Sequence, residues 1–270
     1  MLDRRSFVGS ALALTTVLPS RVTLAQGTSQ STPVFYQSGK LRIQAYLSRP
    51  AGAGPFPLVI FNHGSRAGYE REQRTFSYMA DLYLSAGYAV LIPERRGYGQ
   101  SDGATFSEAV GKNVDAKFIE RLEAEADDVL AALPYLATLP FVDVKRIAIA
   151  GWSFGGIVTM LAIARSSVFK AAIDQAGGAL SWQRSAALRE ALIRAAQRAT
   201  TPILFMDAEN DATTAAVTTL ASTRARFGLP YEIKLYGAFT PKEDPGHIAP
   251  GHLIFGRDGV ALWGGDATRF

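Results

Sequence analysis

The sequence predicts an α/β fold built on a doubly wound, mostly parallel sheet of about eight strands. From residue 34 onward, short apolar runs rich in β-forming residues alternate with longer helical patterns. This order is typical of strands joined by crossover helices. The apolar runs are nearly continuous, which indicates strands covered on both faces. The 270 residues, of which 48% are hydrophobic and 19% charged, suit a globular protein with one sizeable core.

The predicted elements follow one another in a simple order. Residues 33–50 predict an antiparallel pair of strands that turns at Ser38-Gly39. Six further strands are expected at 56–62, 88–94, 146–151, 169–175, 202–208 and 231–237, with helices near 73–86, 118–138, 155–166, 183–199 and 212–227. Because no repeat or Gly/Ser-rich linker divides the chain, we expect residues 26–270 to form a single domain.

The stretch 183–199 has one apolar and one charged face, and Glu190 and Arg194 are spaced i, i+4 on the charged side. Two interpretations fit this pattern. The stretch is either a surface helix, since charged stripes usually face solvent, or a lid over an active site.

The N-terminus has the shape of an export signal, which we assign to residues 1–25. A short charged start precedes an apolar run from Phe7 to Leu18, and small residues lead to Ala25. The pair Arg4-Arg5 resembles the twin-arginine type, and a general secretory signal is the alternative. The apolar run is too short to cross a bilayer, so no membrane anchor is expected after signal removal. The mature protein is expected to be periplasmic or secreted.

Charge and cysteine content exclude several classes of partner and cofactor. Removing residues 1–25 lowers the formal net charge from +4 to +2, and no cluster of Lys and Arg indicates nucleic-acid binding. The chain has no cysteine, which excludes disulfides, thiolate metal sites and a cysteine nucleophile. The histidines lack the spacing of zinc ligands. We therefore expect no metal and no cofactor, and the sequence does not indicate an oligomeric state.

The clearest chemical signal is Gly151-Trp152-Ser153-Phe154-Gly155-Gly156, which stands between a predicted strand and a predicted helix. A Gly-x-Ser-x-Gly motif in this context forms a sharp turn that exposes the serine hydroxyl, and its glycines avoid collisions with the neighbouring strand and helix. A second match, Gly99-Gln100-Ser101-Asp102-Gly103, has neither a strand directly before it nor a long helix after it. Ser153 is therefore the candidate nucleophile, and Ser101 is expected to be a loop serine.

Further blocks resemble one protein family over roughly residues 34–270. They are Asn62-His63-Gly64, Pro93 to Asp102, Asp127 to Leu133, Val142 to Ile147, the 151–156 elbow, Asp207 to Asp211, and Gly251-His252. Together they are similar to the α/β-hydrolase superfamily, specifically its dienelactone hydrolase-like and prolyl oligopeptidase-like branches. One departure is Glu94, which stands where the family usually has an aspartate. The resemblance implies a Ser-His-Asp triad.

The base and acid of such a triad follow the serine along the chain. Of the mature chain's histidines, His63 precedes Ser153, which leaves His247 or His252 as the base. We favour His252, because the resemblance aligns Gly251-His252 with the family's histidine loop and because Pro245 and Pro250 bracket His247 in what is expected to be an exposed loop. For the acid we favour Asp211, just past a predicted strand end, over the alternatives Asp207 and Asp174.

The resemblance also implies an oxyanion hole formed by the backbone N–H groups of Ser65 and Phe154, and an acyl-enzyme mechanism on a small-molecule ester or lactone. A serine peptidase and a non-catalytic binding member of the fold remain alternatives. Five aromatic side chains are expected either to line an apolar pocket or to belong to the core: Tyr69, Trp152, Phe154, Trp182 and Phe239.

Overall fold

A computed structural model describes residues 31–111 and 114–270. The predicted export signal, residues 1–25, lies outside the described residues. Among the described helices, none combines the length and the apolarity that a bilayer crossing requires.

The eight strands form one sheet in the order β1-β2-β4-β3-β5-β6-β7-β8. Their bounds are β1 Thr32–Ser38, β2 Leu41–Ser48, β3 Phe56–Asn62, β4 Ala89–Glu94, β5 Val142–Trp152, β6 Ala172–Gln175, β7 Ile203–Ala208 and β8 Tyr231–Tyr236. Strand β2 pairs antiparallel with both β1 and β4, and every other pairing is parallel. The predicted α/β class, the mostly parallel sheet and its antiparallel N-terminal pair are confirmed.

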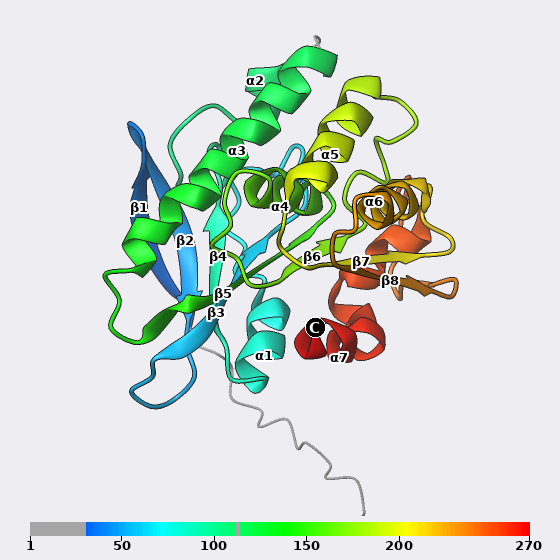
Figure 1. The fold of residues 1–270 in the computed structure, drawn as a ribbon. Helices are drawn as coiled ribbons and strands as arrows, with labels where there is room; N and C mark the ends of the chain where they lie inside the picture. The colour runs from blue at the N-terminus through cyan, green and yellow to red at the C-terminus, as the bar shows by residue number, and fades with distance from the viewer. Residues whose placement is uncertain (1–30, 112–113) are drawn as a thin grey trace, which may run out of the picture.

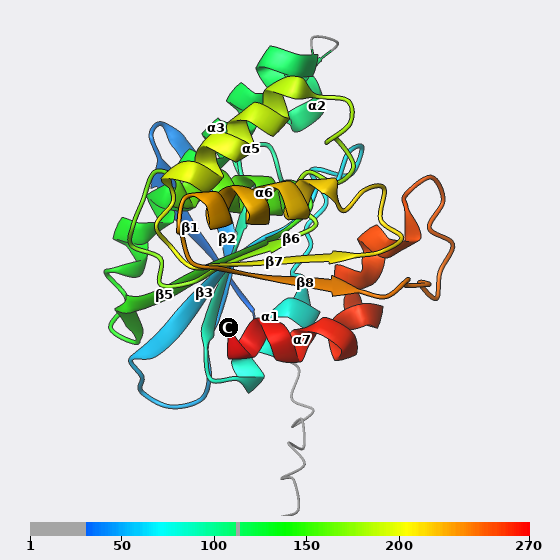
Figure 2. The same ribbon diagram turned by 45° about the vertical axis from the view of Figure 1, so that its right-hand side comes forward.

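Helices cover both faces of the sheet (Figures 1 and 2). Helices α3 to α6 lie on one face, with α1 and α7 on the other. The bounds are α1 Ser77–Ser85, α2 Phe106–Val110, α3 Val114–Leu136, α4 Phe154–Ile163, α5 Ala186–Arg198, α6 Ala215–Arg226 and α7 Val260–Arg269, with two 3₁₀ turns, η1 Pro250–Phe255 and η2 Arg257–Gly259. Each layer buries its own apolar cluster against the sheet.

Helix α5 belongs to the layer that covers the sheet. Its apolar side chains Leu188 and Leu192 are fully buried in the same core cluster as those of α3, α4 and α6. Ser185 caps its first turn by accepting a hydrogen bond from the Leu188 N–H at 3.1 Å. Of the two interpretations of residues 183–199, the structure supports the surface helix.

One expectation about the strands is wrong. Strand β8 was expected to be covered on both faces, but Tyr231 and Leu235 are exposed because β8 is the last strand of the sheet. Pro93 and Glu94 lie at the end of β4, within the strand expected at residues 88–94.

Strand register positions the site. Gly151 of β5 lies opposite Asn62 of β3 on one side and Asp174 of β6 on the other. The carboxyl ends of these three strands therefore meet at one edge of the sheet, which is where open α/β sheets bind ligands.

Candidate active site

Ser153 stands at a strained turn between β5 and α4. Its backbone has φ 59° and ψ −117°, a region that costs a non-glycine residue of order 1–3 kcal/mol and is found mostly at functional sites. In the part of the chain that the structure describes, only Phe76, Ser153 and Ala176 share a positive φ among non-glycine residues. The Ser153 N–H donates to the Gln175 carbonyl at 2.9 Å, which holds the turn against β6.

The glycines around Ser153 are required by close backbone contacts. A Cβ on Gly151 would lie 2.1 Å from the Gly155 carbonyl oxygen, and one on Gly155 would lie 1.9 Å from that of Asn62. No side chain fits at either position. The sequence-based reason for these glycines is therefore confirmed.

His252 and Asp211 form a buried pair. The Nδ1 atom of His252 lies 2.7 Å from Oδ2 of Asp211, and the two side chains are 3% and 0% exposed. The indole N–H of Trp152 donates to the His252 carbonyl at 3.0 Å, which ties the η1 turn to the elbow. The Nε2 atom of His252 is buried and has no hydrogen-bond partner among the described residues. One ring nitrogen is thus fixed by a carboxylate and the other is left free.

The two alternative acids lie nearby without pairing with a histidine. Asp207 is buried in β7, and burial together with the adjacent Asp211 carboxylate raises its pKa to about 9. The proton that Asp207 then keeps can be donated to Asp211. Asp174 accepts a hydrogen bond from the Gly177 N–H at 2.8 Å, and burial raises its pKa to about 7. Asp211 is the acid that contacts His252.

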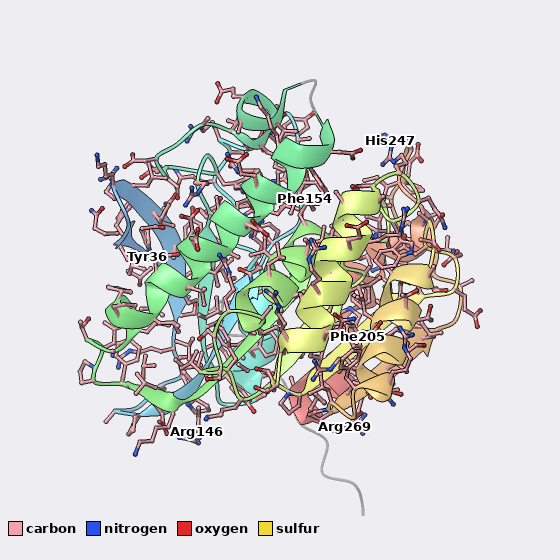
Figure 3. The ribbon with its side chains drawn as sticks, turned by 45° about the horizontal axis from the view of Figure 1, so that its top comes forward. Tyr36, Arg146, Phe154, Phe205, His247 and Arg269 are labelled. Atoms are coloured by element: carbon pink, nitrogen blue, oxygen red, sulfur yellow. The ribbon has the colours of Figure 1, made fainter. Side chains whose placement is uncertain are left out.

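His247 and Ser101 lie in different surroundings. His247 is exposed in the loop between β8 and η1, and Figure 3 shows it at the periphery of the molecule. It lines the outer part of the cleft described below. Ser101 is buried, and its hydroxyl accepts from the Gln44 N–H at 2.8 Å and donates to the Glu94 carbonyl. Ser101 is a loop serine, as expected.

The turn that carries Ser65 passes close to Ser153. A Cβ added to Gly64 would lie 3.3 Å from the Ser153 Cβ and 3.9 Å from its Oγ. On the other side, Phe154 is the first residue of α4, so its N–H has no partner within the helix. Its ring packs against Phe106 and Phe118 at centroid distances of 5.0 and 5.5 Å. The two predicted oxyanion donors, the N–H groups of Ser65 and Phe154, therefore belong to two segments next to Ser153: the turn after β3 and the start of α4.

A buried polar cluster supports the Ser65 turn. Both terminal nitrogens of Arg66 bond to the Glu94 carboxylate, and they also donate to backbone carbonyls of Glu70 and Glu72. His63 packs beside this pair, with its ring stacked on Phe76 at 5.4 Å. Burial, with the nearby arginine cations, holds the pKa of His63 well below its usual range, so its ring is neutral. Sequence reasoning noted Glu94 as a departure but did not find its arginine partner.

A cleft of about 1000 Å³ brings the candidate residues together. Ser153 and His252 both line it, as do Ser65, Trp152 and Tyr69. Phe154, Trp182 and Phe239 do not line it; Trp182 and Phe239 are buried in the core. No aspartate or glutamate stands among the described residues that line the cleft. Its ionisable side chains are three arginines and two histidines: Arg66, Arg74, Arg184, His247 and His252.

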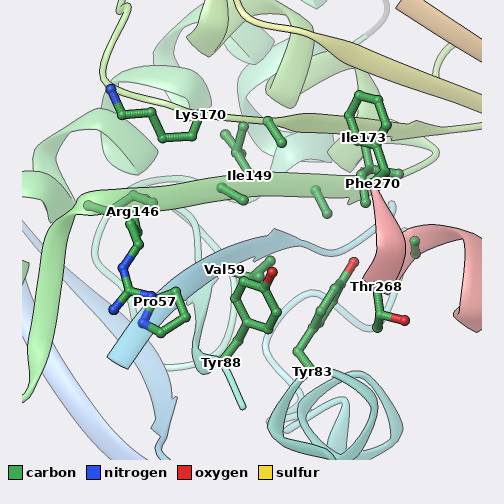
Figure 4. Close-up of a pocket in the computed structure, with 15 residues that line it drawn as sticks. Pro57, Val59, Tyr83, Tyr88, Arg146, Ile149, Lys170, Ile173, Thr268 and Phe270 are labelled. Carbon is green, nitrogen blue, oxygen red and sulfur yellow. The ribbon is translucent and has the colours of Figure 1, made fainter. Parts of the chain in front are cut away.

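A second, smaller cavity of about 280 Å³ lies toward the amino-terminal ends of β3 and β6. Figure 4 shows Tyr83 and Tyr88 standing below β5, with Lys170 at one end and Phe270 at the other. Its lining includes no histidine and no serine. Within residues 31–111 and 114–270, no group of three or more metal-ligating side chains is found either. The cleft at Ser153 is therefore the candidate active site.

Three features define an α/β hydrolase. They are the strand order, the strained serine between β5 and α4, and the buried pair of an aspartate after β7 and a histidine after β8. The sequence model of the dienelactone hydrolase family matches residues 43–249. The protein belongs to the dienelactone hydrolase family.

Relatives of the chain include proteins of several kinds. It is 28% identical over 142 residues to the quorum-quenching protein AidA of Acinetobacter baumannii, a match that covers 53% of this chain and 42% of that protein. It is 29% identical over 140 residues to the uncharacterized peptidase YuxL of Bacillus subtilis, covering 49% and 19%. The chain thus spans less than half the length of these curated relatives.

Solved structures share the fold at low identity. The acylaminoacyl peptidase of Pyrococcus horikoshii superposes with a TM-score of 0.64 at 18% identity, covering 86% of this chain and 39% of that one. An esterase of Pyrococcus furiosus superposes with a TM-score of 0.63 at 14% identity, covering 95% and 94%.

Proposed function

We propose that the protein is an exported serine hydrolase that cleaves carboxylic esters, lactones included, through an acyl-enzyme on Ser153. The observation that carries this proposal is the 2.7 Å contact between Asp211 and a histidine, His252, that lines the same cleft as Ser153. The serine stands at the positive-φ turn that exposes a nucleophile at the end of a strand.

The residues of the cleft have defined roles in this mechanism. His252 Nε2 removes the proton of the Ser153 hydroxyl as the Oγ bonds to the ester carbonyl carbon. The carbonyl oxygen becomes an oxyanion that accepts hydrogen bonds from the Ser65 and Phe154 N–H groups, each worth about 3 kcal/mol of barrier. His252 then passes its proton to the departing alcohol. Asp211 holds the Nδ1–H and stabilises the imidazolium throughout.

The second half of the reaction uses the same groups. His252 Nε2 takes a proton from water, whose oxygen attacks the acyl carbon, and the proton returns to Ser153 Oγ as the carboxylic acid leaves. The released acid loses its own proton to solvent. Apart from water, no co-reactant is needed.

The charge of the cleft supports an ester that carries a negative group. Arg74 and Arg184 line the cleft, and both side chains are exposed to solvent. Arg74 is paired with Glu72 at 3.4 Å, whereas Arg184 donates to the Leu180 carbonyl and has no carboxylate partner among the ion pairs of the described residues. The charge of Arg184 therefore attracts an anionic substrate, and this attraction weakens with salt. We expect a monoester of a dicarboxylic acid to have a lower KM than its neutral diester, with the difference shrinking at high salt.

A direct comparison of substrates tests the reaction class. Purified protein is assayed with p-nitrophenyl acetate and with a p-nitroanilide of matched acyl group. The proposal predicts ester turnover well above amide turnover. The alternative, a serine peptidase, is favoured by the peptidases among the relatives. Preferential cleavage of the anilide, or of peptides, would establish that alternative.

Export rests on the N-terminal sequence. Arg4-Arg5 precede the apolar run from Phe7 to Leu18. Replacing both arginines with lysine is expected to leave the precursor in the cytoplasm, as shown by fractionation and immunoblotting. If the double-lysine precursor is exported at the normal rate, a general secretory signal is the better interpretation.

A further inference from the structure

Strand β8 leaves one edge of the sheet open. It pairs with β7 on one side, and no described strand pairs with its other side. Four of its six residues are exposed, among them Tyr231 at 37% and Leu235 at 48%. A long open edge with apolar side chains is a template for pairing with another strand.

The hydrogen bonds to β7 show which backbone groups of β8 are free. The Pro230 carbonyl accepts from the Ile203 N–H, and the Tyr236 carbonyl accepts from the Glu209 N–H. Backbone groups point alternately to the two sides along a strand. The even-numbered residues of β8 therefore bond to β7. The N–H and C=O groups of Tyr231, Ile233 and Leu235 point to the open edge.

The side chains of β8 alternate between the two faces of the sheet. Lys234 and Tyr236 lie on the face of α7, where both contact Asp266, at 3.7 and 3.0 Å. Ile233 lies on the other face, packed against the core cluster that includes α6. By alternation Glu232 belongs to the α7 face, with Tyr231 and Leu235 on the α6 face. The edge thus presents a charged row on one face and an apolar row on the other.

We propose that β8 is the dimer interface, pairing antiparallel with β8 of a second copy of this chain about a twofold axis at Ile233. In this register Ile233 faces Ile233 of the other copy, and Tyr231 faces Leu235. These odd-numbered residues exchange the hydrogen bonds that each edge lacks. Between them Glu232 of each copy stands opposite Lys234 of the other, which places two ion pairs symmetrically about the axis.

Charge selects this register over its neighbours. The backbone N–H and C=O groups at the open edge belong to odd-numbered residues. A twofold pairing that uses these groups must therefore keep odd residues opposite odd residues when its register shifts. A shift one way places Glu232 opposite Glu232, and a shift the other way places Lys234 opposite Lys234. Like charges directly opposite one another destabilise a strand pair. Only the register centred on Ile233 matches both charges at once, and this self-complementarity favours a second copy as the occupant.

Charge reversal tests the interface. The mass of the full chain is followed against concentration by sedimentation for wild type, Glu232→Lys, the double variant Glu232→Lys/Lys234→Glu, and the control Glu120→Lys on the exposed face of α3. Wild type and control are expected to dimerise equally. Glu232→Lys turns both ion pairs into repulsions and is expected to raise the dimer dissociation constant about tenfold or more. The double variant restores opposite charges across the axis, while it loses the ion pair of Lys234 with Asp266 within each copy, and it is expected to recover dimerisation.

A proline at the axis supplies an independent test. The Ile233 N–H points to the open edge, so Ile233→Pro removes no hydrogen bond to β7 but blocks the central pair of the dimer. This variant is expected to be monomeric with its near-UV circular dichroism unchanged. A monomeric wild-type protein at all concentrations would overturn the proposal. So would a dimer that neither Glu232→Lys nor Ile233→Pro weakens, because its interface would lie elsewhere.

Discussion

At the residue scale, the two nitrogens of His252 have different partners. Nδ1 contacts Asp211 at 2.7 Å, and Nε2 is left without a partner among the described residues. A general base needs this arrangement, because the fixed nitrogen sets the tautomer and the free one accepts the proton. His247 is exposed and contacts no carboxylate in the structure's hydrogen bonds or ion pairs.

Separate alanine variants therefore distinguish the two histidines. His252→Ala is expected to lower kcat for p-nitrophenyl acetate about 10⁴-fold or more, because the serine loses its base. His247→Ala is expected to retain most activity, since it removes only a side chain at the outer part of the cleft. Steady-state kinetics on both variants decide the matter. Near-complete loss at position 247 with substantial activity at 252 would reverse the assignment.

The neighbouring aspartates give a second matched pair. Asp211→Asn is expected to lower kcat about 10⁴-fold, because an amide does not stabilise the imidazolium. Asp207 has its pKa raised to about 9 and is protonated at neutral pH. Asp207→Asn keeps a hydrogen-bond donor beside Asp211 and is expected to retain most activity. The opposite ranking in kcat would show that Asp207 is the acid.

Site residues were predictable from the sequence where the residues that surround them in the structure are also their neighbours along the chain. The strand, glycine and helix around Ser153 are contiguous in the sequence, and Asp211 lies just past an apolar run. The pairing of Arg66 with Glu94 was not predictable, because these residues are 28 positions apart and only the sheet brings them together. The cationic lining by Arg74 and Arg184 likewise depends on loops far apart in the chain.

At the element scale, the elbow between β5 and α4 depends on the contact of Gly155 with Asn62. Gly155→Ala places a methyl group 1.9 Å from a backbone oxygen and is expected to lower the free energy of unfolding by about 2 kcal/mol or more. Gly265 on α7 is exposed, with nothing within 4 Å of an added Cβ. Gly265→Ala is expected to raise stability by roughly 0.5–1 kcal/mol. Urea unfolding of both variants checks the contrast, and equal effects would contradict the steric argument.

The end of β6 gives the stability a pH dependence. Asp174 has its pKa raised from 3.8 to about 7 by burial. The folded state therefore binds this proton more tightly, so its contribution to stability is complete below about pH 4 and is lost as the pH rises toward 7. Asp174→Asn removes this titration. Across that range, the free energy of unfolding of wild type is expected to fall relative to that of Asp174→Asn by on the order of a few kcal/mol. Parallel curves in urea titrations at pH 4 to 8 would show that the carboxyl does not titrate there.

Element boundaries followed the sequence closely for the buried strands β3 and β7 and departed from it for β5. Strand β5 begins at Val142 rather than 146, because Val142 pairs with Phe56 at the start of β3 before the register between the two strands shifts. Strand β8 has the composition of a buried strand but lies at the edge, since pattern alone does not reveal which strand ends a sheet.

At the scale of the whole molecule, two edges of the sheet are assigned a function: one by the cleft at the carboxyl ends of the strands, the other by the proposed interface. The edge formed by the carboxyl ends of its strands carries the cleft, which is assembled from the loops after β3, β5, β6, β7 and β8 and from the η1 turn. Its lateral edge, β8, is the proposed interface. The fold class and strand order follow from the alternation of apolar runs and helices, whereas the cleft exists only once these loops converge.

The most direct test of the central claim is covalent labelling of Ser153. Intact-mass spectrometry after treatment with an organophosphonate is expected to show one adduct on wild type and on Ser101→Ala, with peptide mapping to Ser153. Ser153→Ala is expected to remain folded, to take up no label and to lose about 10⁶ in kcat for p-nitrophenyl acetate. Full turnover by Ser153→Ala, or a wild-type protein that is neither labelled nor active on any ester, would contradict the account.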